Sequence, residues 1–217
     1  FDGGHSIGAC WGDFDGDGTI ELCAYREASG NWYVMKLDES KLVKVANWGG
    51  SGFEPVVGDF DGDGSADIAV YSSTGEWFIQ NAAGKTLVWG LSWGGPGLIP
   101  VSGDFDGDNI TDLALYQESS GQWFIMGLNR EVLAWAELWG GANMRPVSGD
   151  FNGDGLDDMC VYDAASGNWY ARTLAGKTIV WAANWGGAGF EPVSGDFDGD
   201  GVNDLAVYHN TSGRWYI

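Results

Sequence analysis

A nine-residue acidic pattern occurs five times in this chain and constrains its fold more than any other sequence feature. The copies begin at Asp13, Asp59, Asp104, Asp150 and Asp196, so their spacings are 46, 45, 46 and 46 residues. Each copy carries an acid or amide at positions 1, 3, 5 and 9, and Gly usually stands at positions 4 and 6. A fixed period of this length indicates one structural unit that is repeated along the chain.

The alternating acidic residues of each copy lie on a tight Gly-containing turn, so their oxygen atoms should converge on one point. A hard cation with six to eight oxygen ligands needs such a cluster, and without a cation the like charges would repel one another. Five copies make ordinary acidic turns a poor explanation, and calcium is the expected ion. The predicted side-chain ligands are Asp13, Asp15, Asp17 and Glu21; Asp59, Asp61, Asp63 and Asp67; Asp104, Asp106, Asp108 and Asp112; Asp150, Asn152, Asp154 and Asp158; and Asp196, Asp198, Asp200 and Asp204.

The pattern differs from the EF-hand, which also begins with alternating acids. An EF-hand closes with a bidentate acid at position 12 and lies between two helices. Position 12 is apolar in every copy here, and the closing acid stands at position 9 instead. The residues that follow form short apolar runs of the β type, such as Leu205–Tyr208. The sequence therefore predicts a calcium loop between strands.

Three copies deviate from the common pattern. Glu21 lengthens the last ligand of the first loop by one methylene, and Asn152 keeps an oxygen in the fourth loop but removes a charge. Asn109 replaces Gly at position 6 of the third loop, where Asn tolerates a left-handed backbone better than most residues. Of the five predicted metal sites, the third therefore has the weakest support from the sequence.

The net charge of −21 is explained mainly by the repeated loops, which hold 19 of the 31 acidic residues. Five bound Ca²⁺ ions would offset about half of it. The acidity therefore reflects the supply of ligands, and it argues against nucleic acid or an anionic membrane as a partner. No stretch approaches the length of a membrane span, so no membrane insertion is expected. Of the three cysteines, Cys10 and Cys23 flank one loop and could face each other, although buried thiols are the favoured interpretation.

The fourth repeat shows how many strands each unit should contain. Short apolar or alternating runs cover 145–150, 159–162, 168–174 and 178–184, and turn residues separate them. Four strands in about 46 residues are typical of a β-propeller blade. A parallel β-helix would repeat at a much shorter period.

The predicted fold is therefore all-β, a β-propeller of about five four-stranded blades, the last lacking its outer strand. The whole chain, residues 1–217, is expected to form one domain with blades at approximately 1–46, 47–91, 92–137, 138–183 and 184–217. We expect each blade to bury apolar residues, such as Leu205, Val207 and Trp215 in the last one, between its neighbours. An open array would then expose two apolar faces, so we expect the five blades to close into one ring as a monomer. The alternative is a fragment of a longer array, which could pair with a second copy.

The whole chain resembles the FG-GAP/VCBS-type repeats, which are calcium-loop blades known from integrin α-subunit propellers and many secreted bacterial proteins. The residues that carry the resemblance are Gly58–Tyr71 with their four counterparts, together with Thr74–Ile79 and Ser212–Ile217. The resemblance implies that each loop joins the first and second strands of a blade and binds one Ca²⁺. It also implies that the backbone carbonyl of position 7 is a ligand, which would add Thr19, Ser65, Ile110, Leu156 and Val202.

The favoured function is a secreted, extracellular or cell-surface recognition module that binds a glycan, or an extracellular protein, without catalysis. Trp residues at the blade ends could offer stacking platforms for sugars, and the candidates are Trp48, Trp93, Trp139 and Trp185. The competing interpretation is that these residues pack neighbouring blades together, because a residue needed in every blade usually has a structural role.

An enzyme is the alternative function, either a polysaccharide lyase or a glycoside hydrolase domain, and a purely structural spacer in a surface protein is a third. Catalytic residues would break the repeat symmetry. The two histidines, His5 and His209, stand in unlike repeat positions, and the unrepeated acids show no pairing suited to glycoside chemistry. No catalytic residue is therefore predicted.

Overall fold

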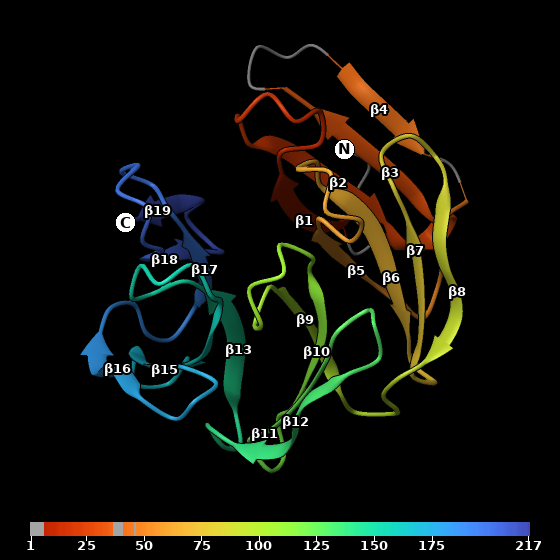
Figure 1. Cartoon of the computed structure of the whole chain (residues 1–217). Coiled ribbons are helices and arrows are strands. Elements are labelled where there is room, and N and C mark those ends of the chain that lie inside the picture. The colour runs from red at the N-terminus through yellow and green to blue at the C-terminus, as the bar shows by residue number, and fades with distance from the viewer. Residues whose placement is uncertain (1–6, 37–40, 46) are drawn as a thin grey trace. The chain divides into compact units, whose positions relative to one another are not determined.

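Five antiparallel β-sheets, one for each repeat, make up the regular structure. The computed structural model describes residues 7–36, 41–45 and 47–217, and within them the regular elements are nineteen strands and a 3-10 helix, η1 (Glu27–Ser29). Four sheets have four strands and the last has three, and in each sheet consecutive strands are neighbours (Figure 1). The prediction of an all-β propeller fold with five blades and a short last blade is confirmed.

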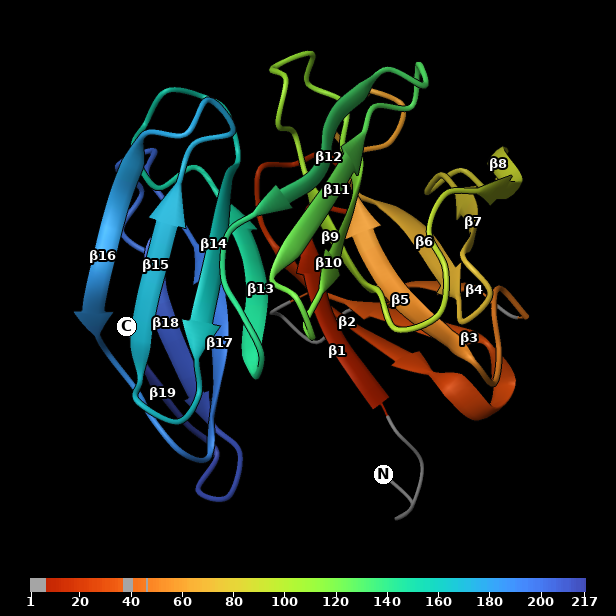
Figure 2. The ribbon, with the colours of Figure 1, turned by 90° about the horizontal axis from the view of Figure 1, so that it is seen from below.

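The strands of the first sheet are β1 (Ile7–Gly12), β2 (Glu21–Arg26), β3 (Asn31–Met35) and β4 (Lys41–Val45). The second sheet contains β5 (Phe53–Gly58), β6 (Asp67–Ser72), β7 (Glu76–Gln80) and β8 (Thr86–Ser92). The third contains β9 (Ile99–Gly103), β10 (Asp112–Gln117), β11 (Gln122–Met126) and β12 (Val132–Leu138). The fourth contains β13 (Met144–Gly149), β14 (Asp158–Asp163), β15 (Asn168–Arg172) and β16 (Thr178–Asn184), which lie side by side in Figure 2. The fifth contains β17 (Phe190–Gly195), β18 (Asp204–His209) and β19 (Arg214–Tyr216).

Each acidic loop joins the first and second strands of its sheet. In the second sheet, Gly58 is paired with Asp67, so the residue before position 1 lies opposite the residue at position 9. The same pairing occurs in the first, fourth and fifth sheets. The nine-residue pattern is thus the closed end of a hairpin, which brings position 9 back beside position 1.

In the second, third and fourth sheets, the second strand is the most deeply buried one. All six residues of β6 are buried, as are the first five of β10 and β14, which agrees with the apolar runs in the sequence. The third strands alternate, and their first Trp is fully buried in four blades: Trp32, Trp77, Trp123 and Trp169 are each 0% exposed. Sheets covered on both faces favour such continuous apolar strands.

The Trp-Gly-Gly motif at the end of a blade is held by two side chains of that blade. In the second blade, the Trp77 indole donates to the Trp93 carbonyl at 2.9 Å. The Tyr71 hydroxyl donates to the Gly95 carbonyl and accepts from the Gly95 N–H, each at 2.9 Å. In the first blade, Gly49 has a φ of 98°, and a Cβ there would lie 2.5 Å from the Tyr25 hydroxyl, so only Gly fits. The repeated Tyr, Trp and Gly residues therefore stabilise the blade ends.

The fifth blade differs from the others in its burial. Trp215 was expected in the core beside Leu205 and Val207, but Trp215 is 46% exposed, whereas Val207 is 1% exposed and Leu205 is half-buried. The prediction for Trp215 is wrong because β19 is the edge strand of a three-stranded sheet, and no fourth strand covers it. Phe197 is likewise 45% exposed, although its four counterparts are at most 8% exposed.

The chain divides into two compact units, 1–102 with 109–111, and 103–108 with 112–217. Within each unit, neighbouring acidic loops are joined by a backbone hydrogen bond, which we call the loop-to-loop hydrogen bond. The N–H of position 8 donates to the carbonyl of position 1 in the preceding loop. The pairs are Ala66 to Asp13 at 2.6 Å, and Thr111 to Asp59, Asp157 to Asp104 and Asn203 to Asp150 at 2.7 Å each. Whether 1–217 behaves as one domain, as expected from the sequence, stays a prediction.

Candidate metal sites

The position-1 carboxylate organises each acidic loop by accepting backbone N–H groups. In the second loop, Asp59 Oδ1 accepts from Gly62 at 2.7 Å and Asp59 Oδ2 accepts from Gly64 at 2.8 Å. The first, fourth and fifth loops repeat the bond from position 6 at 2.7–2.9 Å. These bonds hold the loop in a tight turn.

The position-9 carboxylate is buried beneath the loop. Asp67 is 0% exposed, and its Oδ2 accepts the Phe60 N–H at 2.9 Å. The equivalent bond from position 2 measures 2.8–3.0 Å in the other four loops. Burial, followed by the charges of Asp61 and Asp59, raises the pKa of Asp67 to about 7 despite its hydrogen bonds.

Two further position-9 carboxylates have raised pKa values for the same reasons. Burial and neighbouring carboxylates raise the pKa of Asp112 to about 7 and that of Asp158 to about 6. A buried carboxylate surrounded by others is costly to ionise unless a cation is bound beside it.

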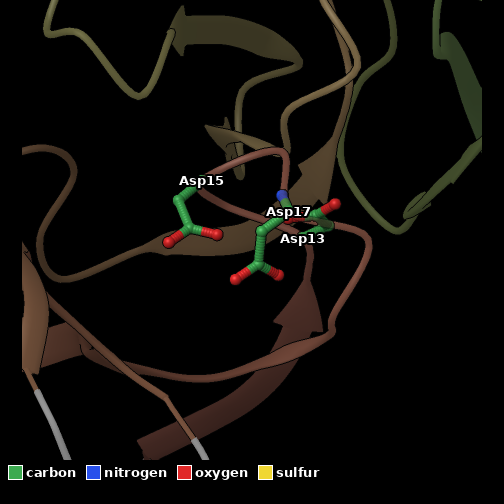
Figure 3. A group of neighbouring side chains, drawn as sticks. All are labelled: Asp13, Asp15 and Asp17. Carbon is green, nitrogen blue, oxygen red and sulfur yellow. The ribbon is translucent and has the colours of Figure 1, made fainter.

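Carboxylates from four of the loops lie close enough to share one ion. In each group, three carboxylates have oxygen atoms within 4.8 Å of one another; the groups are Asp13, Asp15 and Asp17; Asp59, Asp61 and Asp67; Asp104, Asp106 and Asp108; and Asp196, Asp198 and Asp204. Figure 3 shows the first group on the loop that follows β1. Several Asp-rich groups could therefore hold a metal ion, and an all-oxygen donor set suits a hard cation.

Unpartnered buried oxygen atoms test whether a cation fits these loops. Asp61 Oδ1 in the second loop and Glu21 Oε1 in the first are buried, and neither has a hydrogen-bond partner among the described residues. A buried acceptor without a partner costs free energy, more so when it is charged. A bound cation would satisfy both atoms, so the residues present fit a metal.

In the fourth loop, the side-chain amide of Asn152 donates to the position-9 carboxylate, Asp158. Asn152 Nδ2 lies 3.1 Å from Asp158 Oδ2 and 3.4 Å from Asp158 Oδ1, so the amide donates to the position-9 carboxylate. In the third loop, Asn109 has a φ of 63°, which confirms that Asn takes the left-handed conformation that Gly has elsewhere. Both substitutions leave the turn intact.

The residues at position 7 lie within the loops as the sequence predicts. Their N–H groups donate to the position-5 carboxylate at 2.8–3.1 Å in four loops; the donors are Thr19, Ser65, Leu156 and Val202. That the backbone carbonyl oxygens of these four residues and of Ile110 are metal ligands stays a prediction.

Sequence reasoning missed one residue that contacts the first loop, Lys36, which follows β3. Its Nζ lies 2.5 Å from Asp15 Oδ2 and 2.7 Å from Asp17 Oδ2. These hydrogen bonds raise the pKa of Lys36 and lower that of Asp17. The available signal was a lysine directly after the third strand, at a position where the other blades have uncharged residues.

Three of the blade-end Trp residues, Trp48, Trp139 and Trp185, contact the following blade, and the ring of Trp48 lies 5.9 Å from that of Trp89. Trp48 is 9% exposed, and the indole N–H groups of Trp139 and Trp185 donate at 3.2 Å to the third-strand carbonyls of Tyr170 and Tyr216. Trp185 is 40% exposed. The role of Trp48, Trp93, Trp139 and Trp185 in ligand binding stays a prediction.

A second set of Trp residues, on the fourth strands, is strongly exposed and was also missed. Trp89, Trp135 and Trp181 are 74%, 69% and 70% exposed. We call them the outer tryptophans. The signal for them was their spacing of 46 residues on strands that otherwise vary.

The cysteines and the described histidine, His209, lie outside the acidic loops. Cys10 and Cys23 lie directly opposite each other in the first hairpin, as expected, and both are free thiols, as is buried Cys160. His209 Nδ1 lies 2.9 Å from Ser212 Oγ in the turn after β18. His5 lies outside the described residues. Within the described part of the chain, no helix is long and apolar enough to span a membrane.

These features define a β-propeller repeat protein with an acidic loop between the first two strands of each blade. A profile of the FG-GAP-like repeat matches residues 13–70, and the same loop recurs in the later blades. The chain is therefore built from FG-GAP-type propeller repeats. No curated protein sequence matches it significantly.

Solved structures with a similar fold share little sequence with this chain. A lectin from Agrocybe aegerita, which recognises non-reducing terminal N-acetylglucosamine, is 15% identical with a TM-score of 0.59; the match covers 98% of this chain and 65% of the lectin. A protein of unknown function from Bacteroides caccae is 15% identical with a TM-score of 0.50, covering 76% of this chain and 57% of that protein. The chain thus spans less than two thirds of either relative. At this identity the likeness concerns the fold alone.

Proposed function

We propose that this chain is a secreted, calcium-stabilised and non-catalytic recognition module that binds glycans at the cell surface or outside the cell. The observation that carries the proposal is the exposure of the outer tryptophans, Trp89, Trp135 and Trp181, at the same position of three blades. Each of these indole rings is open to a ligand, and an aromatic ring offers a large, rigid contact surface. The apolar face of a sugar ring stacks on an indole, and its hydroxyl groups stay hydrated.

The orientation of each outer tryptophan is fixed by a ring on the neighbouring strand. Trp89 meets Phe78 edge to face with ring centroids 5.2 Å apart, and Trp135 meets Phe124 in the same way at 5.2 Å. Trp181 meets Tyr170 at 5.3 Å. An indole that is already held in place loses little entropy when a ligand stacks on it.

A β-bulge directs each outer tryptophan away from the sheet. The residue after each Trp has a left-handed backbone, with φ of 66° at Gly90, 56° at Ala136 and 54° at Ala182, and the register shifts at the same place in all three sheets. A non-Gly residue in this conformation is strained, and such strain clusters at functional sites. The repeated bulge supports a binding role for these three side chains.

Calcium belongs to the proposal because the loops offer the oxygen donors and the unpartnered buried atoms that a hard cation would satisfy. When bound, the ion would neutralise the clustered carboxylates. The chain's own carboxylates shape the loop. The position-1 carboxylate holds the turn, and the position-9 carboxylate holds the loop to the second strand. The likeness in fold to a lectin agrees with glycan recognition.

Absence of catalysis is also part of the proposal. Among the described residues, the acidic, His or Cys groups close enough to share an ion all lie in the repeated loops. We expect pure protein to turn over no polysaccharide. Turnover that is lost on mutating one unrepeated residue would contradict this and favour a lyase or hydrolase.

The test is a glycan array probed with the whole chain, with and without calcium. We expect binding in calcium that is lost in a variant carrying Trp89→Ala, Trp135→Ala and Trp181→Ala with an unchanged melting temperature. Leu138→Ala is the matched control, because Leu138 is 64% exposed on β12 but is not an outer tryptophan. Binding that survives the triple substitution, or no binding to any glycan, would contradict the proposal.

A further inference from the structure

The side chain of Lys36 places an ammonium group among the carboxylates of the first acidic loop. Lys36 follows the last residue of β3, and its Nζ lies 2.5 Å from Asp15 Oδ2 and 2.7 Å from Asp17 Oδ2. Asp15 and Asp17 belong to the group, with Asp13, whose oxygens converge within 4.8 Å. The lysine thus contacts two of the four side chains that would hold a cation at this loop.

The same position in the other blades carries no charge. The residue that follows the third strand is Asn81 after β7, Gly127 after β11 and Thr173 after β15. Asn81 Nδ2 donates to Asp61 Oδ2 at 2.9 Å, so this position faces the acidic loop in the second blade as well. In the first blade a positive charge replaces a neutral donor at a position that already contacts the metal ligands.

An ammonium group and a calcium ion compete for the same oxygen atoms. Lysine offers three donors and one positive charge, whereas calcium needs six to eight oxygen ligands and brings two charges. Asp15 and Asp17 cannot serve both at these distances, because two cations would then lie side by side. Calcium can take these oxygens only after Lys36 has moved away.

The first loop also contains a buried carboxylate oxygen that Lys36 does not contact. Glu21 is 0% exposed, and its Oε2 accepts the Phe14 N–H at 2.8 Å, but its Oε1 has no hydrogen-bond partner among the described residues. Lys36 pairs with Asp15 and Asp17, and among the described residues it makes no hydrogen bond or ion pair with Glu21. The loop is therefore still able to bind an ion once the lysine withdraws.

We propose that Lys36 is a tethered competitor for calcium, and that it makes the first loop the weak and readily exchanged site of the five. The proposal rests on calcium binding by the acidic loops, which is part of the proposed function. In the metal-free chain, Lys36 partly neutralises the first loop. At high calcium the ion displaces the lysine, so the first blade responds to calcium over a higher range of concentration than the others.

Isothermal titration calorimetry of the decalcified full chain tests this, with wild type compared with Lys36→Met. We expect the wild type to show one site at least tenfold weaker than the rest, and Lys36→Met to tighten that site at least tenfold. Lys36→Gln is a second variant that keeps a polar end. Lys85→Met is the matched control, because Lys85 is an exposed lysine of the same unit and its replacement removes the same charge.

The possible outcomes distinguish the role of Lys36 from calcium binding by the acidic loops. Equal calcium stoichiometry and affinity in wild type, Lys36→Met and Lys36→Gln would overturn the role of Lys36 and leave calcium binding intact. The same gain in Lys85→Met would show that only the net charge matters, which also overturns it. If no variant binds calcium, the proposed calcium binding itself is wrong.

Discussion

The first and second acidic loops have almost the same sequence pattern but different electrostatic surroundings. In the second loop, Asp61 receives one neutral hydrogen bond, from Asn81, and keeps a buried oxygen without a partner among the described residues. In the first loop, the ammonium of Lys36 pairs with Asp15 and Asp17. The difference shows that the demand for a cation is set partly outside the nine-residue pattern, by the residue that follows the third strand.

Removal of calcium should have the largest effect on stability. If each loop bound calcium with a dissociation constant ten times below the ambient concentration, linkage would add about 1.4 kcal/mol per site. Four such sites with a tenfold weaker first loop approach about 6 kcal/mol, which lies within the usual stability of about 5–15 kcal/mol for a whole domain. We expect excess EDTA to lower the melting temperature by about 15–25 °C. An unchanged melt, with calcium loss verified by elemental analysis, would rule this out.

The metal-free chain should lose stability as pH rises from about 4 to about 7. The pKa values of Asp67, Asp112 and Asp158 are about 7, 7 and 6 in the folded chain, above the value of about 3.9 in an unfolded chain. The folded state then holds more protons than the unfolded state in this window, so the free energy of unfolding falls as pH rises.

A loss on the order of 1 kcal/mol per carboxylate would lower the melting temperature in EDTA by about 6–12 °C between pH 5 and pH 7.5. Calcium should abolish the decline, because the ion binds the charged carboxylates. Melting curves at both pH values, with calcium and with EDTA, give the comparison. A melting temperature in EDTA that increases over this range would contradict the prediction.

Matched substitutions at position 3 should separate the first loop from the second. Asp61→Asn removes a ligand charge from the second site, and loss of that site costs about 1.4 kcal/mol, or about 3–6 °C, in calcium. Asp15→Asn should cost less, because it also removes one of the two carboxylates that hold Lys36 in competition with the ion. Thermal melts at a fixed calcium concentration measure both losses. Equal losses would contradict the idea that Lys36 weakens calcium binding at the first loop.

Replacement of Cys23 should have the smallest effect. Cys23 is 4% exposed and opposite Cys10 at the base of the first loop, where the second loop has Ala69 opposite Val56. Cys23→Ala therefore introduces a residue that this fold already accepts, and we expect a loss of at most about 1 kcal/mol. A loss above about 3 kcal/mol under non-reducing conditions would instead indicate a disulfide with Cys10 in solution.

Local features of the repeat were predictable from the sequence. The four strands expected at 145–150, 159–162, 168–174 and 178–184 correspond to β13–β16, with end shifts of one or two residues. The acidic loops lie between the first and second strands because Gly and alternating acids specify a tight turn between two apolar runs. The left-handed backbone at Asn109 followed from the same turn chemistry.

Features that depend on neighbours were not predictable in this way. Trp215 has the same local sequence as its buried counterparts, and its exposure comes from the three-stranded sheet around it. Lys36 occurs once, so a search for repeated residues passes over it. The bulges that turn Trp135 and Trp181 outward depend on strand register rather than on residue type. Closure of five blades into one ring stays a prediction.

The loop-to-loop hydrogen bond has a consequence for how such chains can lengthen or shorten. The bond joins backbone atoms, and position 8 holds a different residue in each case: Ala66, Thr111, Asp157 and Asn203. Asp157 adds a side-chain bond, because its Oδ2 accepts the Asp104 N–H at 2.8 Å. The Gly before position 1 makes this variation possible, because a Cβ at Gly58 would lie within 3 Å of Thr111. A Gly at this place therefore leaves room for whichever residue stands at position 8 of the next loop. Duplication or deletion of a whole 46-residue unit would keep this backbone bond at the new junction, whereas side-chain pairs between neighbouring blades, such as Arg172 with Glu137 and Arg145 with Glu191, belong to single junctions.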